Sequence, residues 1–415
     1  MRTYRRQNKE AKPKAQNQQG ITLEAQLPME EWIRGTQADI EAFAAQLGLH
    51  VMQRVMEAEI EQKLGQWGQQ SVYRHGHQPG YVCFEGRKVK LARRPRLRSR
   101  EGSEVMLNSY KAFQQNGKME QAVARQMMRQ CSTRDYEGAV EQCLKGYGIK
   151  RSSVSRHWKA ATAKELQQLM ERPVPKELLV LMIDSKFFGG DCVSAAIGVD
   201  NQGRKHVLGI WHGATENAAV VKGLLEDLAT RGLEIQSGHH LLVVLDGAKA
   251  LRKAVTQVLG DQALVQRCRI HKMRNVTDQL PKDKQAQVSR RMREAWAEKD
   301  PKVAEQRLRR MSQSLKESWP NAAASLLEGL EETLTVQRLQ VSPRLCRTLS
   351  NTNLMEGCFA RAAYWTRRVK RWDGPEMILR WTAAALLAAE KKFKRINGAA
   401  QLKDLEKALN EFQKC

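Results

Sequence analysis

The chain has 415 residues, 41% of them hydrophobic, so it can form sizeable cores and is long enough for roughly two to four domains. Lysine and arginine number 70 against 45 aspartates and glutamates, and this net charge of +25 predicts a polyanionic partner, most simply nucleic acid. No apolar stretch approaches the ~20 residues of a membrane helix, and no apolar segment follows the first charges as in a signal peptide. The eight scattered cysteines fit reduced thiols in the cytoplasm better than a disulfide scaffold.

The first 71 residues divide into a basic arm and a helical region. Residues 1–20 are polar, basic and without periodicity, so we expect a disordered arm that contacts phosphates. Within residues 21–71, apolar side chains recur at helical spacing, namely Leu47, Val51, Met52, Val55, Met56, Ile60 and Leu64. The pattern predicts a helix with a packing face that is suited to self-association.

Residues 72–116 have the pattern of a basic β-hairpin. Turn-forming pairs occur at Pro79-Gly80 and Glu85-Gly86, and strand-like pieces flank the second pair. A basic ribbon can follow a phosphate backbone, and Arg96, Arg98 and Arg100 alternate so that they would share one face. The candidate DNA contacts here are Arg87, Lys88, Lys90, Arg93, Arg94, Arg96 and Arg98. The alternative is a solvated edge strand whose charges discourage aggregation.

Residues 117–172 indicate two helices joined by a short turn. A serine or threonine is available to cap each helix, and Gly146 lies near the end of the first. This is the outline of a helix-turn-helix DNA-binding module, with Arg151, Arg156 and Lys159 as candidate contacts. Any helical hairpin has the same outline, and the cluster of basic residues favours the DNA-binding alternative.

Two apolar runs, each followed by an aspartate, organise residues 173–280. Residues 178–183 lead into Asp184, and residues 241–245 lead into Asp246. Short apolar runs predict strands buried on both faces, and open α/β sheets carry functional groups where such strands end. If the strands pair, the two carboxylates meet, which is costly unless a cation such as Mg²⁺ or Mn²⁺ lies between them. The alternative is that each aspartate only caps the turn after its strand.

The remaining elements place these strands in a mixed fold. From residue 173 the order is three strands, helix, strand, helix and strand, which is the order of a ribonuclease H-like α/β core. Helical spacing without strand signals predicts an all-helical insertion over residues 281–345. Residues 346–415 then complete the core with a helix that carries Glu356, followed by a basic track of Arg367, Arg368, Lys370 and Arg371 and by further helices. A mainly helical DNA-binding region would precede this core.

Five long phrases carry a resemblance to a known family: MIDSKFFGG, AAIGVDNQGRKHVLGIWHGATEN, VVLDGAKAL, QRCRIHKMRN and NTNLMEGCFARAAYWTRRVKRW. Over residues 72–395 the sequence resembles the Mutator-type insertion-sequence transposases. The resemblance implies a ribonuclease H-like core with an Asp-Asp-Glu metal triad, which falls on Asp184, Asp246 and Glu356. Chemistry alone does not select the glutamate, since any helix offers glutamates, and the family motif decides it. The family's Cys-x-x-His element falls on Cys268 and His271, which with Arg274 are the supporting residues.

The function implied by the resemblance is that of a DNA transposase acting by two-metal phosphoryl transfer. Two Mg²⁺ ions, or Mn²⁺ in their place, would serve cleavage at terminal inverted repeats and transfer of the freed 3′-OH to target DNA. We expect a homodimer on double-stranded DNA, in the cytoplasm at the nucleoid. One alternative is a catalytically inactive DNA-binding regulator on the same fold. Another is a tyrosine recombinase, with His271 and Arg274 as its His-x-x-Arg element and Tyr364 as its nucleophile.

Overall fold

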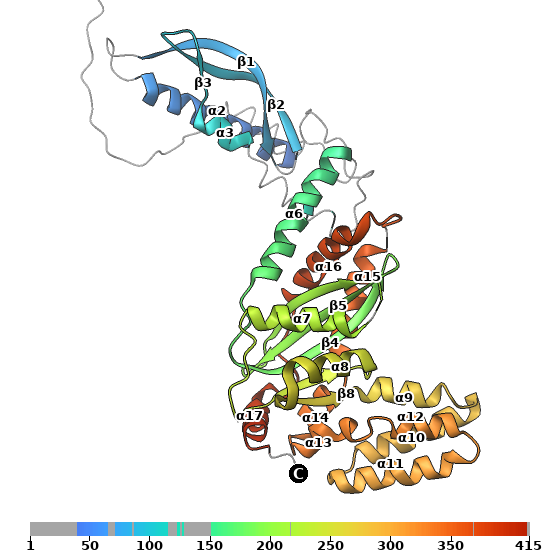
Figure 1. Cartoon of the computed structure of the whole chain (residues 1–415). Helices are drawn as coiled ribbons and strands as arrows, with labels where there is room; N and C mark the ends of the chain where they lie inside the picture. The colour runs from blue at the N-terminus through green and yellow to red at the C-terminus, as the bar shows by residue number, and fades with distance from the viewer. Residues whose placement is uncertain are drawn as a thin grey trace, which may run out of the picture. The chain divides into compact units, whose positions relative to one another are not determined.

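The computed structural model describes residues 40–64, 71–84, 87–114, 123–124, 127, 151–215, 217–367 and 369–412 (Figure 1). The chain separates into two compact units. The first comprises residues 1–119 and 140–149, and the second comprises residues 120–139 and 150–415. The predicted arm over residues 1–20 lies outside the described residues, as does most of the first helix of the predicted helix-turn-helix.

The first unit is a long hairpin covered by helices. Strands β1 (Val72–Phe84) and β2 (Arg87–Ser99) pair antiparallel, β3 (Glu104–Val105) pairs with β2, and the helices are α2 (Ile40–Leu64) and α3 (Asn108–Gln114). Met56 and Ile60 of α2 are buried against Val82, Leu91 and Leu97 of the hairpin, so alternate strand positions face α2. The structure therefore confirms the hairpin and the helical packing face, and this face packs on the hairpin of the same chain.

One predicted turn in this unit is wrong. Pro79-Gly80 does not reverse the chain but lies inside β1, at a register shift between Gln78 and Gly80. Proline has no N–H to give to a sheet, so within a strand it is confined to edges and irregularities such as this one. The chain reverses instead between β1 and β2, where Phe84 pairs with Arg87.

The second unit is built on a five-stranded mixed sheet. Its strands are β4 (Leu178–Phe188), β5 (Asp191–Asp200), β6 (Lys205–Gly213), β7 (Leu241–Leu245) and β8 (Ala263–Arg267), in the spatial order β6-β5-β4-β7-β8. The first three strands along the chain are antiparallel neighbours, and β7 and β8 run parallel to β4. The predicted mixed α/β class and the predicted order of strands are both confirmed.

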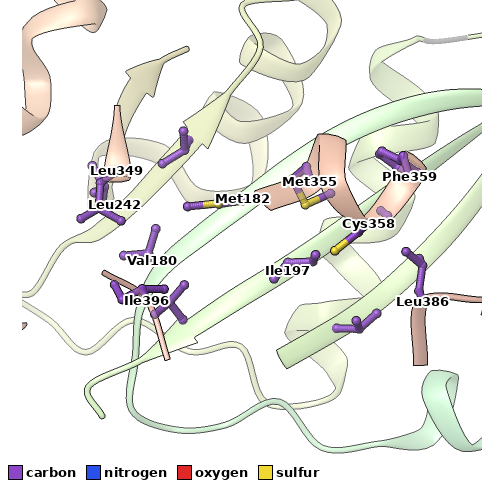
Figure 2. Packing of buried hydrophobic residues seen from close by; sticks show 14 of the residues in the cluster. Val180, Met182, Ile197, Leu242, Leu349, Met355, Cys358, Phe359, Leu386 and Ile396 are labelled. Atoms are coloured by element: carbon purple, nitrogen blue, oxygen red, sulfur yellow. The ribbon is translucent and has the colours of Figure 1, made fainter. Parts of the chain in front are cut away.

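Helices cover both faces of this sheet. On one face α7 (Ala218–Thr230) and α8 (Lys249–Leu259) pack on Leu181, Ile183 and Val243. On the other face the core includes residues of α6 (Arg151–Glu171), α15 (Asn353–Thr366), α16 (Gly374–Glu390) and α17 (Leu402–Asn410). Figure 2 shows Met355 and Cys358 of α15 lying over Met182 and Ile197 of the sheet. The glutamate-bearing helix is therefore part of the core.

The chain between β8 and α15 is helical throughout its regular elements. It contains α9 (Arg269–Thr277), α10 (Lys282–Trp296), α11 (Pro301–Lys316), α12 (Pro320–Leu327), the 3-10 turn η2 (Glu331–Leu334), α13 (Thr335–Arg338) and α14 (Pro343–Leu349). Helices α9 to α12 share a separate apolar core, which includes Met292, Leu308 and Leu326, and they lie together beside β8 (Figure 1). The helical periodicity predicted for residues 281–345 is confirmed.

Candidate active site

Asp184 and Asp246 occupy equivalent positions on two neighbouring parallel strands. In the β4–β7 pairing Ile183 lies opposite Leu245, so the next residue of each strand is one of the two aspartates. Asp184 is 8% exposed and shares the strand face of Met182, which packs beneath α15. The strand register thus supports the prediction that the two carboxylates lie close together, at the same end of two neighbouring strands.

The strand that carries Asp184 does not end there, which corrects the sequence prediction. β4 continues to Phe188, because residues 184–188 pair antiparallel with residues 191–195 of β5. The parallel partner β7 does end at Leu245, directly before Asp246. Asp184 therefore lies where the hairpin extends beyond the parallel part of the sheet, and its backbone is fixed by β5.

Both aspartates also bond to the backbone beside them. An Asp184 carboxylate oxygen accepts the Ser185 N–H at 2.9 Å, and an Asp246 oxygen accepts the Ala248 N–H at 2.8 Å, just before α8. Gly247, between Asp246 and that helix, has a φ of +105°, a conformation that favours glycine. Asp246 therefore caps the turn after β7 through one of its carboxylate oxygens.

Glu356 lies in the first turn of α15 and faces the imidazole of His271 and the guanidinium of Arg274, both on α9. Its Oε1 is 3.5 Å from His271 Nε2 and 3.4 Å from Arg274 Nη1. Helix α9 begins directly after β8, and the Cys268 N–H donates to Leu245 O at 2.7 Å, one residue before Asp246. The segment that carries Cys268, His271 and Arg274 therefore contacts both Glu356 and the end of β7.

Thr352 completes this network and was not identified from the sequence. Its N–H donates to Cys268 Sγ at 3.4 Å, and its Oγ1 lies 3.3 Å from His271 Nδ1. The capping position of the glutamate helix belongs to Thr352, whose side chain contacts Cys268 and His271. Its position four residues before Glu356, one helical turn away, was the signal available.

Cys268 and His271 shift each other's pKa, and His271 also interacts with the two aspartates. Burial would raise the pKa of the Cys268 thiol, but hydrogen bonds from His271 and Thr352 outweigh burial and hold that pKa below its usual value. The hydrogen bond with Cys268 raises the pKa of His271 against the opposing effect of burial. The negative charges of Asp184 and Asp246 raise the His271 pKa further, so the imidazole lies within electrostatic reach of both carboxylates.

The donor chemistry of the three carboxylates fits a hard cation. Aspartate and glutamate oxygens are the ligands that Mg²⁺ and Mn²⁺ prefer, and Asp184 is buried on the face that α15 covers. Among the described residues, however, no three His, Cys, Asp or Glu side chains stand close enough together to hold one ion. Glu356 is paired with His271 and Arg274 instead.

The basic residues of the hairpin differ in exposure and in ion pairing. Lys90 and Arg93 are exposed, whereas Arg94 and Arg96 form ion pairs with Glu104 of β3 at 2.7 and 2.9 Å. Arg98 is half-buried, and the side chains of Arg87 and Lys88 lie outside the described residues. Arg100 follows the end of β2, so the predicted alternating face stops at Arg98. Part of the predicted basic ribbon is therefore neutralised within its own sheet.

The other candidate DNA contacts lie in the second unit. Arg156 and Lys159 are exposed on α6, whose opposite side packs on α16 through Trp158 and Trp381, with ring centroids 4.6 Å apart. Helix α6 is thus anchored on the core by one side and presents its basic residues on the other. Of the basic track after Glu356, Arg367, Lys370 and Arg371 are exposed, and the side chains of Arg151 and Arg368 lie outside the described residues.

In the part of the chain that the structure describes, no helix combines the length and the apolar character that crossing a membrane requires.

The sequence profile of a family described as "Transposase, Mutator family" matches residues 22–395. The transposase for insertion sequence element ISRM5 of Rhizobium meliloti (strain 1021) is 25% identical over 368 residues, covering 86% of this chain and 89% of the relative. The transposase for IS905 of Lactococcus lactis subsp. lactis (strain IL1403) is 24% identical over 69% of this chain and 72% of its own. The transposase for IST2 of Acidithiobacillus ferrooxidans is 28% identical over 49% of this chain and 66% of its own.

Proposed function

The chain belongs to the Mutator family of transposases, and from this premise we propose that it binds the terminal inverted repeats of an insertion sequence and cleaves and joins DNA there. Asp184, Asp246 and Glu356 are the catalytic residues of this proposal. The observation that supports it is the register of β4 and β7, in which Ile183 lies opposite Leu245 and each is followed by one of the two aspartates. Glu356, on the helix that covers this face, is the third carboxylate.

The proposed core is ribonuclease H-like. Three antiparallel strands followed by two strands parallel to the first, in the order β6-β5-β4-β7-β8, support this assignment, as does the presence of helices on both faces. In such a sheet the acidic residues at the end of the central strands lie at one opening, where a phosphodiester can approach.

The three carboxylates would hold Mg²⁺, with Mn²⁺ as a substitute. When bound, a pair of such ions would activate the attacking oxygen and stabilise the leaving 3′ oxygen of a phosphodiester. The surrounding residues hold the three carboxylates in position. The Asp246 turn fixes one carboxylate and the β4–β5 pairing fixes Asp184. His271, which contacts Cys268 and Thr352, would orient Glu356 together with Arg274, since both approach the same carboxylate oxygen.

The basic surfaces would bind the DNA. Lys90 and Arg93 in the first unit, and Arg156 and Lys159 in the second, are exposed and carry positive charge toward solvent. Phosphate contacts fix the register of a protein on a duplex, so we assign these residues to positioning of the repeat ends. We further propose that two copies act together at the nucleoid in the cytoplasm, because the two ends of an element must be cut in concert.

The test is cleavage of labelled repeat-end DNA by the purified full chain, with Mg²⁺ or with EDTA. We expect free 3′-OH ends only with the metal, and loss of cleavage by at least about a thousandfold in Asp246→Asn, while DNA binding is retained. The matched control is Asp191→Asn, which removes a carboxylate from the same sheet that is bonded to His212. Equal activity of Asp246→Asn and the Asp191→Asn control would refute the proposed site.

The same assay separates the alternatives. A tyrosine recombinase would leave label on the denatured protein, in EDTA as well as in Mg²⁺, and would lose it in Tyr364→Phe. We expect Tyr364→Phe to retain cleavage, because Tyr364 is 51% exposed and lies 4.4 Å beneath the Arg367 guanidinium as a stacking partner. An inactive regulator would bind repeat ends and yield no 3′-OH ends with either metal.

A further inference from the structure

A buried arginine lies between the Asp246 turn and the helical insertion. Arg267 is the last residue of β8 and is 6% exposed. Its Nη2 donates to the carbonyl oxygen of Gly247 at 2.6 Å, and its Nη1 donates to the carbonyl oxygen of Glu328 at 2.7 Å. Gly247 directly follows Asp246, and Glu328 directly follows α12. One guanidinium therefore bonds to both segments.

The charge of Arg267 is compensated from the insertion side. The Glu328 carboxylate lies 3.6 Å from Arg267 Nη1, and the Glu332 carboxylate lies 3.9 Å from its Nε. The buried Lys272 donates to two carbonyl oxygens at the end of α12, those of Ser325 and Glu328. A buried cation is costly to keep without partners, so the two carboxylates stabilise the guanidinium, whereas Lys272 is a second positive charge nearby and acts by holding the end of α12.

Two glycines allow the chain to approach the guanidinium this closely. A Cβ atom at Gly247 would lie 2.6 Å from Arg267 Nε, and a Cβ at Gly329 would lie 2.8 Å from its Nη1. Both glycines have positive φ angles, +105° and +59°. The turn after Asp246 is therefore shaped around Arg267, and its orientation follows from the position of this side chain.

We propose that Arg267 is a positioning residue for Asp246, which it aligns by fixing the Gly247 carbonyl against the end of α12. The inference rests on the proposed function, in which Asp246 is a metal ligand. Groups that orient a ligand from behind commonly change metal affinity or activity by about 10–100-fold when they are removed. We therefore expect the loss of Arg267 to weaken metal binding at Asp246 and to leave DNA binding unchanged.

The test compares Arg267→Gln with Arg252→Gln in the full chain. Arg252 of α8 also binds Glu332, at 2.6 Å, so its removal loosens the same end of the insertion without touching Gly247. The first readout is the Mg²⁺ concentration for half-maximal cleavage, which should rise about tenfold or more in Arg267→Gln only. The second readout needs no cleavage of DNA. Fe²⁺ with ascorbate cuts a protein backbone beside a bound metal, and cuts near residue 246 should weaken only in Arg267→Gln.

Two further variants keep the result decisive. Gly247→Ala leaves Arg267 in place and pushes the turn away from it, so we expect the same loss of Fe²⁺ cuts even if Arg267→Gln fails to fold. Unchanged Fe²⁺ cuts and unchanged Mg²⁺ dependence in folded Arg267→Gln would overturn the inference, as would equal shifts in Arg252→Gln. If Asp246→Asn retains the Fe²⁺ cuts and DNA cleavage, the proposed function itself fails, whatever Arg267 does.

Discussion

Glu59→Gln should destabilise the hairpin unit, because this carboxylate joins α2 to α3. The Glu59 carboxylate accepts the backbone N–H groups of Asn108 and Ser109, both at 2.8 Å, at the start of α3, and lies 3.2 Å from Lys63 one turn along α2. These donors belong to segments about 50 residues away in the chain, so the carboxylate contributes to the tertiary structure of the unit. Glutamine keeps an acceptor oxygen but removes the charge that strengthens each bond.

The pKa of Glu59 gives the magnitude of this effect. Burial would raise the pKa of Glu59, but hydrogen bonds from Ser109, Asn108 and Lys63 outweigh burial and lower it from 4.5 to about 2. At about 1.4 kcal/mol per pKa unit, such a shift corresponds to at most about 3.4 kcal/mol. Contact with water reduces this figure, so we expect about 2 kcal/mol for the loss of the charge.

The sign of the pH dependence follows from the lowered pKa. Because Glu59 releases its proton more easily in the folded unit, the stabilisation is complete above the unfolded pKa of 4.5 and disappears as the pH falls toward about 2. Glu59→Gln should therefore be less stable than the natural chain at pH 6, and the difference should shrink as the pH falls below 4.5.

Hydrogen exchange of the full chain measures this prediction locally. Amides of β1 and β2 should exchange about 30-fold faster in Glu59→Gln at pH 6, which is the ratio that about 2 kcal/mol gives. Glu61→Gln is the matched control. Glu61 lies on the same helix, but its side chain is exposed and its ion pair with Arg74 is long, at 4.0 Å. Equal exchange in both variants, or a difference that grows as the pH falls below 4.5, would refute the reasoning.

Two other predictions concern a tight turn and the DNA-binding surface. Gly203→Ala should lower stability by about 1–3 kcal/mol in thermal unfolding, because φ is +77° and the new Cβ would lie 2.7 Å from the Ala399 Cβ. Gly374→Ala is the control for the backbone strain alone, because Gly374 has a φ of +76° and an added Cβ would meet nothing within 4 Å. An equal loss of stability in both variants would show that the contact with Ala399 does not contribute. Replacing both Lys90 and Arg93 by glutamine should reduce the slope of log affinity against log salt by about 2 for repeat-end DNA, measured by titration, and an unchanged slope would remove them from the interface.

The sheet and its aspartate pair could be predicted because their signals are local and strong. Apolar runs of five or six residues are buried on both faces in β4 and β7, and each run marks its strand without knowledge of its neighbours. The end of β4 could not be predicted in the same way. Ser185, Lys186 and Phe187 are half-buried or exposed, so their strand conformation depends on pairing with β5 and not on their own polarity.

Contacts between distant segments account for the other differences. The basic residues of β2 could be read directly from the sequence. Their ion pairs could not, because Arg94 and Arg96 pair with Glu104 on the neighbouring strand β3. Similarly, Thr352 was not identified from the sequence, because its contacts to Cys268 and His271 join positions more than 80 apart in the chain. The choice of Glu356 needed the family motif, and its contacts with His271 and Arg274 supply a physical reason that the sequence lacked.

Residues 266–274 run from the edge strand β8 into α9 and are held by contacts with both the sheet and the insertion. β8 is an edge strand, and an open edge invites pairing with other chains unless something covers it. Here the returning chain covers it, because Gln266 and Arg269 both donate to the Thr333 carbonyl oxygen while the Cys268 N–H bonds to β7. Helix α9 is thus held from the sheet and from the insertion at once. The orientation of His271 toward Glu356 then depends on both, so loss of the Arg269 contact with Thr333 should disturb the candidate site even where no catalytic side chain has changed.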